Sequence, residues 1–475
     1  MLSEQLSPFL TEVFKESIAL QSLPASMTQG IISLIPKPKK DLLSLDNWRP
    51  ITLLNIDYKI LALLFVNRLK GILPSIIDES QSGFMKNRHI VNNIRLVLDL
   101  LDYSDLIDTD SFIMFLDFQK AFDSVEHNFI YKSLEKCGFG PYFCSTIKTL
   151  YNNNNSSIKL KFGTSQRFVL SRGIRQGCPI SPYLFLIVVQ FLFTHISQSP
   201  LRGIKIVGKH LVISQLADDT TLFLKDASQV PLALNLISSF SKASGPHLNL
   251  NKCELLSIKD STAASVCDIQ VKNQVTYLDI IISKDPTLRC PTNFSSTIQK
   301  TQRKLNSWLQ RDLSLKGRIL LSKAEGLSRL SYTAQSLYVD NNTLKNIDRM
   351  LLDFVWKRKV HYIKKSVLIN SANHGGLNFI DFSTLNNTLK IIWIRNVLLN
   401  PSVWNIIPSF IFSKLGGLKF LLTCNYNIPK IPMKLSNFHK QMLLAWSLIF
   451  KHNFSPHTCF IWNNKYITHK KKSVY

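Results

Sequence analysis

The sequence predicts an α+β fold, with strands and helices mixed up to residue 285 and mostly helices beyond it. Short apolar runs bounded by turn residues indicate strands in the first part, whereas apolar residues recur at helical spacing in the second. The chain is 45% hydrophobic and contains 29 Phe, so it can bury a large core. Its 475 residues predict more than one domain or subdomain.

The first part is expected to begin with a helical lead-in and to continue with alternating strands and helices. The elements are a lead-in over residues 1–26, strands over 31–35 and 112–118, helices over 57–73, 89–103, 182–197 and 231–243, and a hairpin over 212–224. Asp123 and Glu126 have the spacing of a capping box, which predicts that Asp123 caps the following helix. The polar run 152–157 separates two β-prone segments and is expected to tip another hairpin.

The helices after residue 285 are expected to form a bundle with a basic polar face. That face contains Arg303, Lys304, Arg311, Lys316, Arg318 and Lys323. Trp308 is expected in the core of the bundle rather than on a base-stacking surface. Residues 346–475 are basic and aromatic and include the run Lys470–Lys472.

The charge balance predicts a polyanionic partner. The chain has 57 Lys and Arg against 31 Asp and Glu, a net charge of +26. This sign is expected for a protein that faces a phosphate backbone, although a basic protein without nucleic-acid function stays open on charge alone.

The cysteines and the apolar segments point to an intracellular protein of the nucleus or cytoplasm. The eight Cys are scattered without paired spacing, which predicts reduced thiols and no structural zinc. The N-terminal residues lack the pattern of a signal peptide. The longest apolar stretch, 183–196, is interrupted by Gln190 and is too short to cross a bilayer, so no membrane association is expected.

Three carboxylates at predicted strand ends are the main candidates for chemistry. Asp117 ends one apolar run, and Asp218 and Asp219 lie between the two strands of the predicted hairpin. Such groups are costly to desolvate unless a cation compensates them. Carboxylates from adjacent strands would suit two Mg²⁺ or Mn²⁺ ions, which activate a 3′-hydroxyl and stabilise leaving pyrophosphate in phosphoryl transfer.

Several motifs occur in an order that resembles a known family. They are Leu34–Lys37, Trp48–Ile51, Gln81–Phe84, Phe115–Asp123, Gly173–Pro182, Ala217–Asp219, Leu250–Lys252, Phe354–Lys357 and Gly375–Leu377. This order resembles the reverse transcriptases of non-LTR (LINE-type) retrotransposons over about residues 28–380.

The resemblance implies a right-hand polymerase, with fingers and palm built from an antiparallel sheet plus helices. Fingers and palm would span 27–285, a helical thumb 286–345 and a mostly helical C-terminal region 346–475. The implied activity is RNA-directed DNA polymerase, a nucleotidyltransferase that extends a primer 3′-hydroxyl with dNTPs. The implied partners are an RNA template and a DNA primer.

The resemblance also implies roles for single residues. Asp117 and Asp218 would bridge both metal ions, Asp219 would complete the acidic cluster, and Lys252 would protonate departing pyrophosphate, with an ordinary turn lysine as the alternative. The implied nucleotide-binding residues are Lys37 and Arg49 at the triphosphate, Phe122 beneath the sugar, and Gln176 and Gly177 in the pocket wall. The alternatives for the lysine and arginine are solvated loop charges, and for Gln176 and Gly177 an ordinary turn.

The sequence departs from the family pattern at the expected primer grip, Tyr277, Leu278 and Asp279. Relatives usually have Gly at position 279, and a carboxylate there can repel primer phosphates. Leu216 also replaces the usual aromatic residue before Ala217. No endonuclease domain or zinc knuckle is expected in this sequence, which suggests a fragment or a truncated element.

Two functions from different classes therefore remain. The first is the polymerase, favoured by the intact acids, Phe122 and Gln176. The alternative is a catalytically impaired, RNA-binding remnant, favoured by Asp279. A group II intron maturase or telomerase-like enzyme is disfavoured by the motifs after residue 350.

Overall fold

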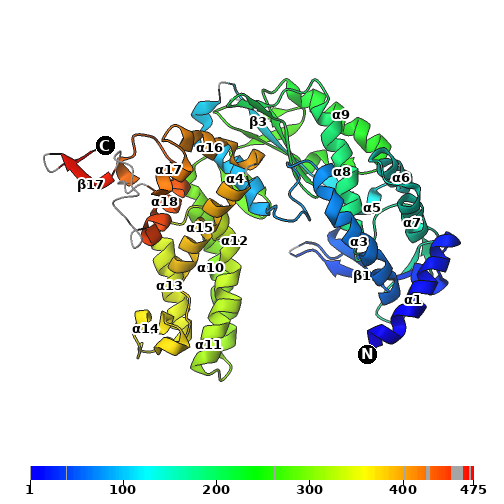
Figure 1. The fold of residues 1–475 in the computed structure, drawn as a ribbon, viewed down its shortest axis with the longest axis horizontal. Helices are drawn as coiled ribbons and strands as arrows, with labels where there is room; N and C mark the ends of the chain where they lie inside the picture. The colour runs from blue at the N-terminus through cyan, green and yellow to red at the C-terminus, as the bar shows by residue number, and fades with distance from the viewer. Residues whose placement is uncertain are drawn as a thin grey trace. The chain divides into compact units, whose positions relative to one another are not determined.

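The computed structural model describes residues 2–38, 40–107, 109–261, 263–400, 402–423, 428–450, 464–469 and 472–474. The chain divides into two compact units, each with its own arrangement of elements (Figure 1). The first unit contains Met1–His89, Thr109–Ile204 and His210–Val271, and the second contains Ile90–Asp108, Lys205–Lys209 and Lys272–Tyr475. The first is mixed and the second mostly helical, which confirms the predicted α+β class. The domain boundaries drawn from the resemblance stay predictions.

A six-stranded sheet forms the centre of the first unit. Its strands, in spatial order, are β13 (Ser265–Val266), β14 (Ile269–Lys272), β12 (Glu254–Ser257), β3 (Phe112–Leu116), β10 (Asp219–Leu224) and β9 (Ile213–Leu216). Strand β3 is buried along its whole length and pairs antiparallel with β10 and β12. The predicted hairpin 212–224 is confirmed, because β9 and β10 pair directly.

A second sheet of the same unit has the strand order β2 (Trp48–Leu54), β1 (Gln29–Pro36), β5 (Asn155–Ile158) and β6 (Phe168–Val169). The prediction of a hairpin tip at 152–157 is wrong. Residues 155–158 are themselves a strand, which pairs parallel with β1 and antiparallel with β6. The sequence misled because the polar side chains of Ser156 and Ser157 are buried in this sheet rather than exposed in a turn.

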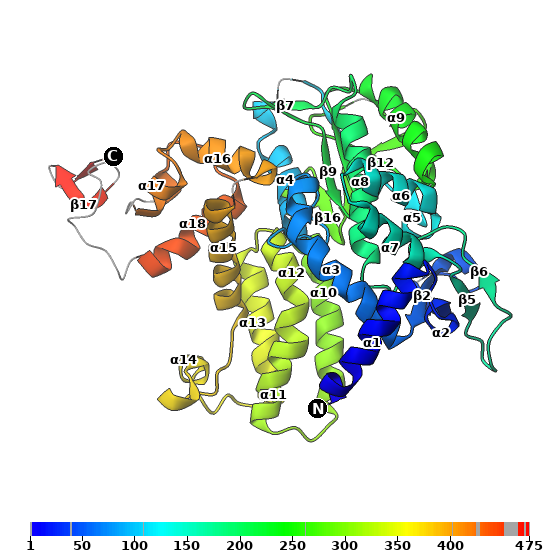
Figure 2. The same cartoon turned by 45° about the vertical axis from the view of Figure 1, so that its right-hand side comes forward.

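Helices surround the sheets of the first unit. They are α1 (Leu2–Ala19), α2 (Ala25–Thr28), α3 (Ile56–Ile76), α5 (Ala121–Ser124), α6 (His127–Lys136), α7 (Pro141–Tyr151), α8 (Ser181–Ser197) and α9 (Gln229–Ser244). Helix α8 is apolar on nearly every face because it packs against α3, α6, α9 and β9 (Figure 2). The remaining short strands are β4 (Phe118–Gln119), which pairs with β11 (His247–Leu248), and β7 (Ile204–Ile206) and β8 (Lys209–Leu211).

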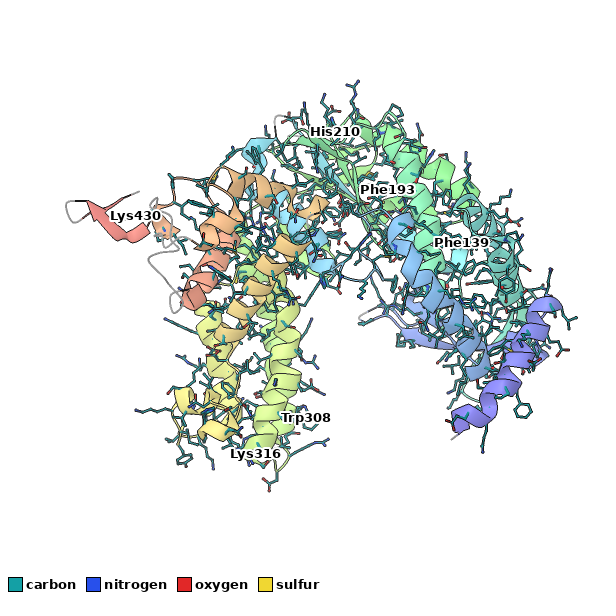
Figure 3. The ribbon with its side chains drawn as sticks, in the orientation of Figure 1. Phe139, Phe193, His210, Trp308, Lys316 and Lys430 are labelled. Carbon is teal, nitrogen blue, oxygen red and sulfur yellow. The ribbon has the colours of Figure 1, made fainter. Side chains whose placement is uncertain are left out.

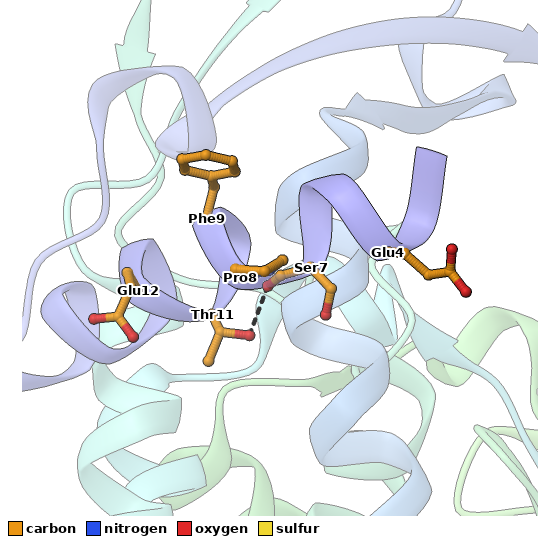
Figure 4. A pocket seen from close by; sticks show the side chains of 6 residues that line it. All are labelled: Glu4, Ser7, Pro8, Phe9, Thr11 and Glu12. Carbon is orange, nitrogen blue, oxygen red and sulfur yellow. Dashed lines mark hydrogen bonds between the residues drawn. The ribbon is translucent and has the colours of Figure 1, made fainter. Parts of the chain in front are cut away.

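Helix α1 buries one face and exposes another. Phe14 belongs to the core of the first unit, whereas Phe9 is exposed. Glu4, Ser7 and Phe9 border an open hollow on the outer side of the helix, beside the Thr11 hydroxyl that donates to the Ser7 carbonyl at 2.7 Å (Figure 4).

The second unit is a helical assembly with two short hairpins, β15–β16 and β17–β18. Its elements are α4 (Ile90–Asp102), β15 (Gln274–Tyr277), β16 (Ile280–Ser283), α10 (Pro286–Leu309), α11 (Leu315–Leu321), α12 (Ser328–Ser336), α13 (Asn341–Val355), α14 (Lys365–Ile369), α15 (Phe382–Leu399), α16 (Ile406–Ser413), α17 (Leu418–Thr423), α18 (Asn437–Phe450), β17 (Asn464–His469) and β18 (Lys472–Val474). Buried residues of α10, α12, α13 and α15 share one core. The predicted bundle after residue 285 is confirmed.

The predicted basic face of the bundle is only partly solvent-facing. Lys316 lies at the start of α11, near Trp308 at the end of α10 (Figure 3). The Trp308 ring is partly buried against the core, with the Arg311 guanidinium 4.9 Å from its centroid. Arg318 on this face is half-buried, and its guanidinium donates to the carbonyls of Val355 and Leu313 and so ties α13 to the start of α11.

Within the described ranges, no helix has both the length and the hydrophobicity that a bilayer crossing requires. The cysteines described, at positions 137, 144, 178, 253, 267 and 290, are free thiols. Cys424, Cys459 and the lysines at 470 and 471 lie outside the described residues.

Candidate active site

The three candidate carboxylates lie at one end of neighbouring strands. Asp117 directly follows β3, Asp218 lies in the turn between β9 and β10, and Asp219 begins β10. Because Leu116 of β3 is paired with Thr220 of β10, the residues after one strand and before the other meet at the same edge. The structure therefore brings together the acids that the sequence singled out.

Burial and mutual repulsion shape the electrostatics of this edge. Burial raises the pKa of the Asp218 carboxyl, and the nearby Asp117 charge raises it further. The Asp117 side chain is 43% exposed. Two carboxylates this close, one of them desolvated, create a local demand for positive charge.

Lys252 partly meets this demand. It ends a short 3₁₀ turn, Leu250–Lys252, and its Nζ lies 3.4 Å from Asp117 Oδ2. The turn is anchored by the Asn249 N–H, which donates to the Asp117 carbonyl at 2.8 Å. Because the lysine is 61% exposed, this ion pair is weak and can be exchanged for another cation or for a substrate phosphate.

The Asp218 turn is held by a buried glutamine. Gln81 Oε1 accepts hydrogen bonds from the N–H groups of Ala217 and Gly83, both at 2.8 Å. Ala217 has φ 53°, a left-handed conformation that costs energy for a residue with a Cβ. A Cβ on Gly83 would lie 2.6 Å from the Ala217 nitrogen, so only glycine permits this approach. The contacts of Gln81 and Gly83 therefore fix the turn that carries Asp218.

The donor set fits hard divalent cations, which prefer carboxylate oxygens. Asp117 and Asp218 supply such oxygens from adjacent backbone segments, and the ammonium of Lys252 marks the place where positive charge is favoured. Among the described residues, no group of three or more His, Cys, Asp and Glu side chains converges on one point.

Two of the predicted pocket residues, Phe122 and Gly177, pack against other elements of the first unit. Phe122, in α5, stacks on Phe185 of α8 with ring centroids 4.1 Å apart. A Cβ on Gly177 would lie 2.2 Å from the Thr52 carbonyl oxygen, and Gly177 has φ +125°. This position requires glycine because the chain passes directly over Thr52 of β2.

Asp123 is not a helix cap, and the capping-box prediction is wrong. Residues 121–124 form their own helical turn, α5, and the N-cap of α6 is Glu126, without a side-chain capping bond. The Asp123 carboxylate instead accepts a 3.0 Å hydrogen bond from Gln176 Nε2. Burial raises the pKa of Asp123, while the bond from Gln176 opposes that shift. Gln176 is thus held from both ends, because its carbonyl also accepts from the Thr52 N–H at 2.7 Å.

The predicted triphosphate residues lie on and beside the β1–β2 hairpin. Lys37 follows β1, and its Nζ donates to the Asp46 carbonyl at 2.9 Å. Arg49 lies on β2 with an exposed side chain. Lys120, which the sequence reading did not single out, bonds Asp46 Oδ1 at 2.8 Å and so links this hairpin to the segment that carries Phe122.

The expected primer grip lies in the second unit, as a tight turn between β15 and β16. Leu278 and Asp279 have φ values of 50° and 60°, the left-handed pair of a type I′ turn. The Tyr332 hydroxyl donates to the Leu278 carbonyl at 2.6 Å. The Asp279 side chain is exposed. The left-handed φ at position 279 favours glycine there, regardless of which molecule the turn contacts.

The sequence did not predict the contacts that three residues make at the site, namely Gln81, Lys120 and Asp123. Gln81 and Lys120 both stand inside motifs that carried the family resemblance, so motif membership was the available signal. Their partners lie far away along the chain, 136 residues for Gln81 and Ala217, and local pattern cannot reveal such contacts.

Comparison with known proteins identifies a family that matches the segment containing these site residues. The family described as "Reverse transcriptase (RNA-dependent DNA polymerase)" matches residues 35–282, which is more than half of the chain. The "Transposon TX1 uncharacterized 149 kDa protein" of Xenopus laevis is 30% identical over 398 residues, covering 82% of this chain and 30% of that protein. A "Retrovirus-related Pol polyprotein from type-1 retrotransposable element R2" of Popillia japonica is 25% identical, covering 76% of this chain and 52% of that protein.

A third relative, "RNA-directed DNA polymerase from mobile element jockey" of Drosophila funebris, is 24% identical and covers 74% of this chain and 40% of that protein. The chain thus spans about half or less of the length of these relatives. Among solved structures, a telomerase from Candida tropicalis has a TM-score of 0.45 at 14% identity, covering 82% of this chain and 64% of that one.

Proposed function

The chain belongs to the reverse transcriptases of non-LTR retrotransposons, and from this premise we propose that it is an active RNA-directed DNA polymerase. In this proposal it extends a primer 3′-hydroxyl with dNTPs on an RNA template. The observation that carries the proposal is the meeting of Asp117 and Asp218 at one sheet edge, with Lys252 beside them. These partners and dNTPs would place the activity in the nucleus or cytoplasm.

The proposed mechanism assigns the carboxylates to metal binding. Two bound Mg²⁺ or Mn²⁺ ions would lower the pKa of the primer hydroxyl and neutralise the developing charge on the phosphates. Asp117 and Asp218 would hold them, with Asp219 adding negative charge to the cluster. Gln81 contributes indirectly, by keeping the Asp218 turn in one conformation.

The remaining residues would handle the nucleotide. Lys252 can leave Asp117 and donate a proton to departing pyrophosphate, since its present ion pair is largely solvated. The stacked ring of Phe122 would exclude a ribose 2′-hydroxyl. Gln176, fixed by Asp123, would line the pocket, and Lys37 and Arg49 would contact the triphosphate.

A second candidate function is a catalytically impaired, RNA-binding remnant. One observation favours it, namely the exposed carboxylate of Asp279 on the β15–β16 turn, where it would repel a nucleic-acid backbone. The net charge of +26 suits either function.

Primer extension separates the two functions. The purified chain is given an RNA template, an annealed DNA primer, labelled dNTPs and Mg²⁺, beside Asp218→Asn and the control Asp110→Asn. Asp110 is an exposed carboxylate of the same unit, so its change tests the loss of a negative charge away from the site. We expect extension by wild type and Asp110→Asn and a loss of at least about 100-fold in Asp218→Asn. Salt-sensitive RNA binding without extension by wild type would favour the remnant.

A further inference from the structure

A cavity of about 410 Å³ lies within the second unit, at the end of α4 and the beginnings of α10 and α18. Its charged lining is strongly one-sided. The cationic residues are Arg95, Lys284, Arg289, Lys434 and Lys440, and the one lining carboxylate is Asp102. Among the residues described, a concave site with this balance attracts an anion.

Arg95 is the central observation, because it is buried and incompletely bonded. Its side chain is 2% exposed, and its guanidinium pairs with Asp99 and donates to the Ser336 carbonyl at 3.2 Å. The guanidinium also lies 3.9 Å from the centroid of the Phe438 ring. Its Nε has no hydrogen-bond partner within the described part of the chain. A buried charged donor without a partner is costly, so an acceptor at this position would be stabilised.

Helix geometry adds positive potential to the same cavity. Asn437 and Phe438, the first residues of α18, line it, and so does Pro286, the first residue of α10. Helix α18 is longer than three turns, and its N-terminal end carries a partial positive charge. The start of α10 is instead capped by the Asp285 carboxylate, which accepts a 2.8 Å hydrogen bond from the Thr287 N–H. The N-terminus of α18 and five cationic side chains thus line one volume.

Acids near the cavity compensate part of this charge, and Asp99 pairs with Arg95. Asp102 is engaged by Arg289, whose Nε also donates to the Ser283 carbonyl at 2.7 Å. Lys434 lies 3.6 Å from Asp105, but both side chains are largely exposed, so water screens the pair. Lys440 is exposed at the rim.

The other walls are apolar and aromatic. They comprise Leu98, Leu101, Leu337, Leu435 and Tyr338. The volume lies within the range of pockets that hold small organic ligands. An anion with an attached apolar ring system matches a cationic end and an apolar wall.

We propose that this cavity binds a nucleotide through its phosphate group. The phosphate oxygens would accept from Arg95 and from the start of α18, and the base would lie against Tyr338 and the leucines. The shared chemistry is a phosphate oxyanion, supplied either by a free nucleotide or by one residue of a single-stranded polynucleotide. The site does not depend on polymerase activity, and its test needs no turnover.

The test measures binding in EDTA, which suppresses metal-dependent binding at the acidic site. The probes are inorganic pyrophosphate, AMP and a single-stranded RNA dodecamer, followed by calorimetry. The double variant Lys434→Glu/Lys440→Glu reverses two exposed charges of the cavity. Its matched controls are Lys345→Glu, an exposed lysine of α13 outside the cavity, and the neutral Lys440→Gln.

We expect AMP to bind wild type and Lys345→Glu alike, the double variant to bind at least about tenfold more weakly, and Lys440→Gln to lie between them. If AMP binds as tightly as the dodecamer, the ligand is a free nucleotide. If only the dodecamer binds, the ligand is a polynucleotide. Equal affinity for all variants, or no binding of any probe by wild type, overturns the proposal. If the double variant is unfolded by circular dichroism, Lys440→Gln decides.

Discussion

At the scale of single residues, the bond between Asp123 and Gln176 links two motifs that the sequence presents separately. Asp123 Oδ1 accepts from Gln176 Nε2, and the backbone carbonyl of Gln176 accepts from the Thr52 N–H, so three segments meet at one residue. If Gln176 lines the nucleotide pocket, Asp123 sets its orientation without contacting the nucleotide.

Asp123→Ala is therefore expected to weaken nucleotide use more than it changes the chemical step. Loss of the acceptor should raise KM for dNTP about 5- to 20-fold, corresponding to about 1–2 kcal/mol for a hydrogen bond to a charged group. Asp123→Asn keeps an acceptor oxygen and should stay within about threefold of wild type. Single-nucleotide extension kinetics give KM and kcat separately. If Asn behaves like Ala, the charge of Asp123 matters rather than its acceptor.

The Asp279 turn separates a backbone effect from a charge effect. Asp279→Gly should raise the free energy of unfolding by up to about 1 kcal/mol, because glycine adopts φ +60° without a Cβ penalty, and Asp279→Ala should lower it. Asp279→Asn removes the charge and tolerates the left-handed conformation. If the carboxylate repels primer, both Gly and Asn should increase primer extension. Increased extension in Gly but not in Asn would contradict charge repulsion.

Local pattern sufficed to predict that three acids lie together and failed for the contacts of Asp123. Asp117, Asp218 and Asp219 end or begin apolar runs, and the structure brings them to one sheet edge. Asp123 matched a capping box in the sequence, but its partner lies 53 residues away. The metal-binding roles assigned to the three acids, and the roles assigned to the other site residues, stay predictions.

At the scale of elements, strand pairing and a long-range side-chain bond act together on the β9–β10 turn. The hairpin itself was predictable from two apolar runs around a polar pair. The buried Gln81 that fixes the turn was not, because its amide reaches the turn from a segment outside the hairpin. The polar strand β5 was missed for a related reason, since its serines are buried only by sheet pairing with β1 and β6.

Gln81→Ala is expected to loosen the turn that carries Asp218. The change leaves the buried N–H groups of Ala217 and Gly83 without their acceptor, which should cost about 1–3 kcal/mol of stability. Primer extension should fall more than this loss of stability accounts for, because Asp218 loses its fixed position. The control Gln270→Ala removes an exposed glutamine of the same unit. Denaturant unfolding and extension below the transition check both effects, and full activity in Gln81→Ala would contradict the role of the clamp.

At the scale of the whole molecule, helix α4 shows what a linear reading cannot assign. Its helical pattern was predictable, but it belongs to the second unit although the strands before and after it belong to the first. It buries Arg95 and Asp99, which a surface helix would expose. Their partners, among them Ser336 and His439, come from the last third of the chain.

This buried cluster should make the second unit sensitive to acid through His439. Burial and the Arg95 charge hold the pKa of His439 well below its usual value, so the folded imidazole stays neutral, with its Nδ1 2.7 Å from the Tyr103 hydroxyl. Below pH 6.5 the unfolded chain takes up a proton that the folded chain refuses, and stability is lost as pH falls. Asp99 acts in the opposite sense, because burial raises its pKa to about 7 and the folded state then binds the extra proton between pH 3.8 and 7.

Replacing His439 by Gln should therefore remove the contribution of the histidine to the pH dependence of stability and leave the contribution of Asp99. Below pH 6, the free energy of unfolding should fall less steeply with decreasing pH in His439→Gln than in wild type. The two slopes should differ by up to about 1.4 kcal/mol per pH unit, the value for one proton. Trp fluorescence follows this unit, since six of the seven Trp lie after residue 300. His210→Gln, at an exposed position, should leave the wild-type slope unchanged. Equal slopes in His439→Gln and wild type would show that His439 is protonated in the folded state, and the buried cluster would then carry one more positive charge than its hydrogen bonds account for.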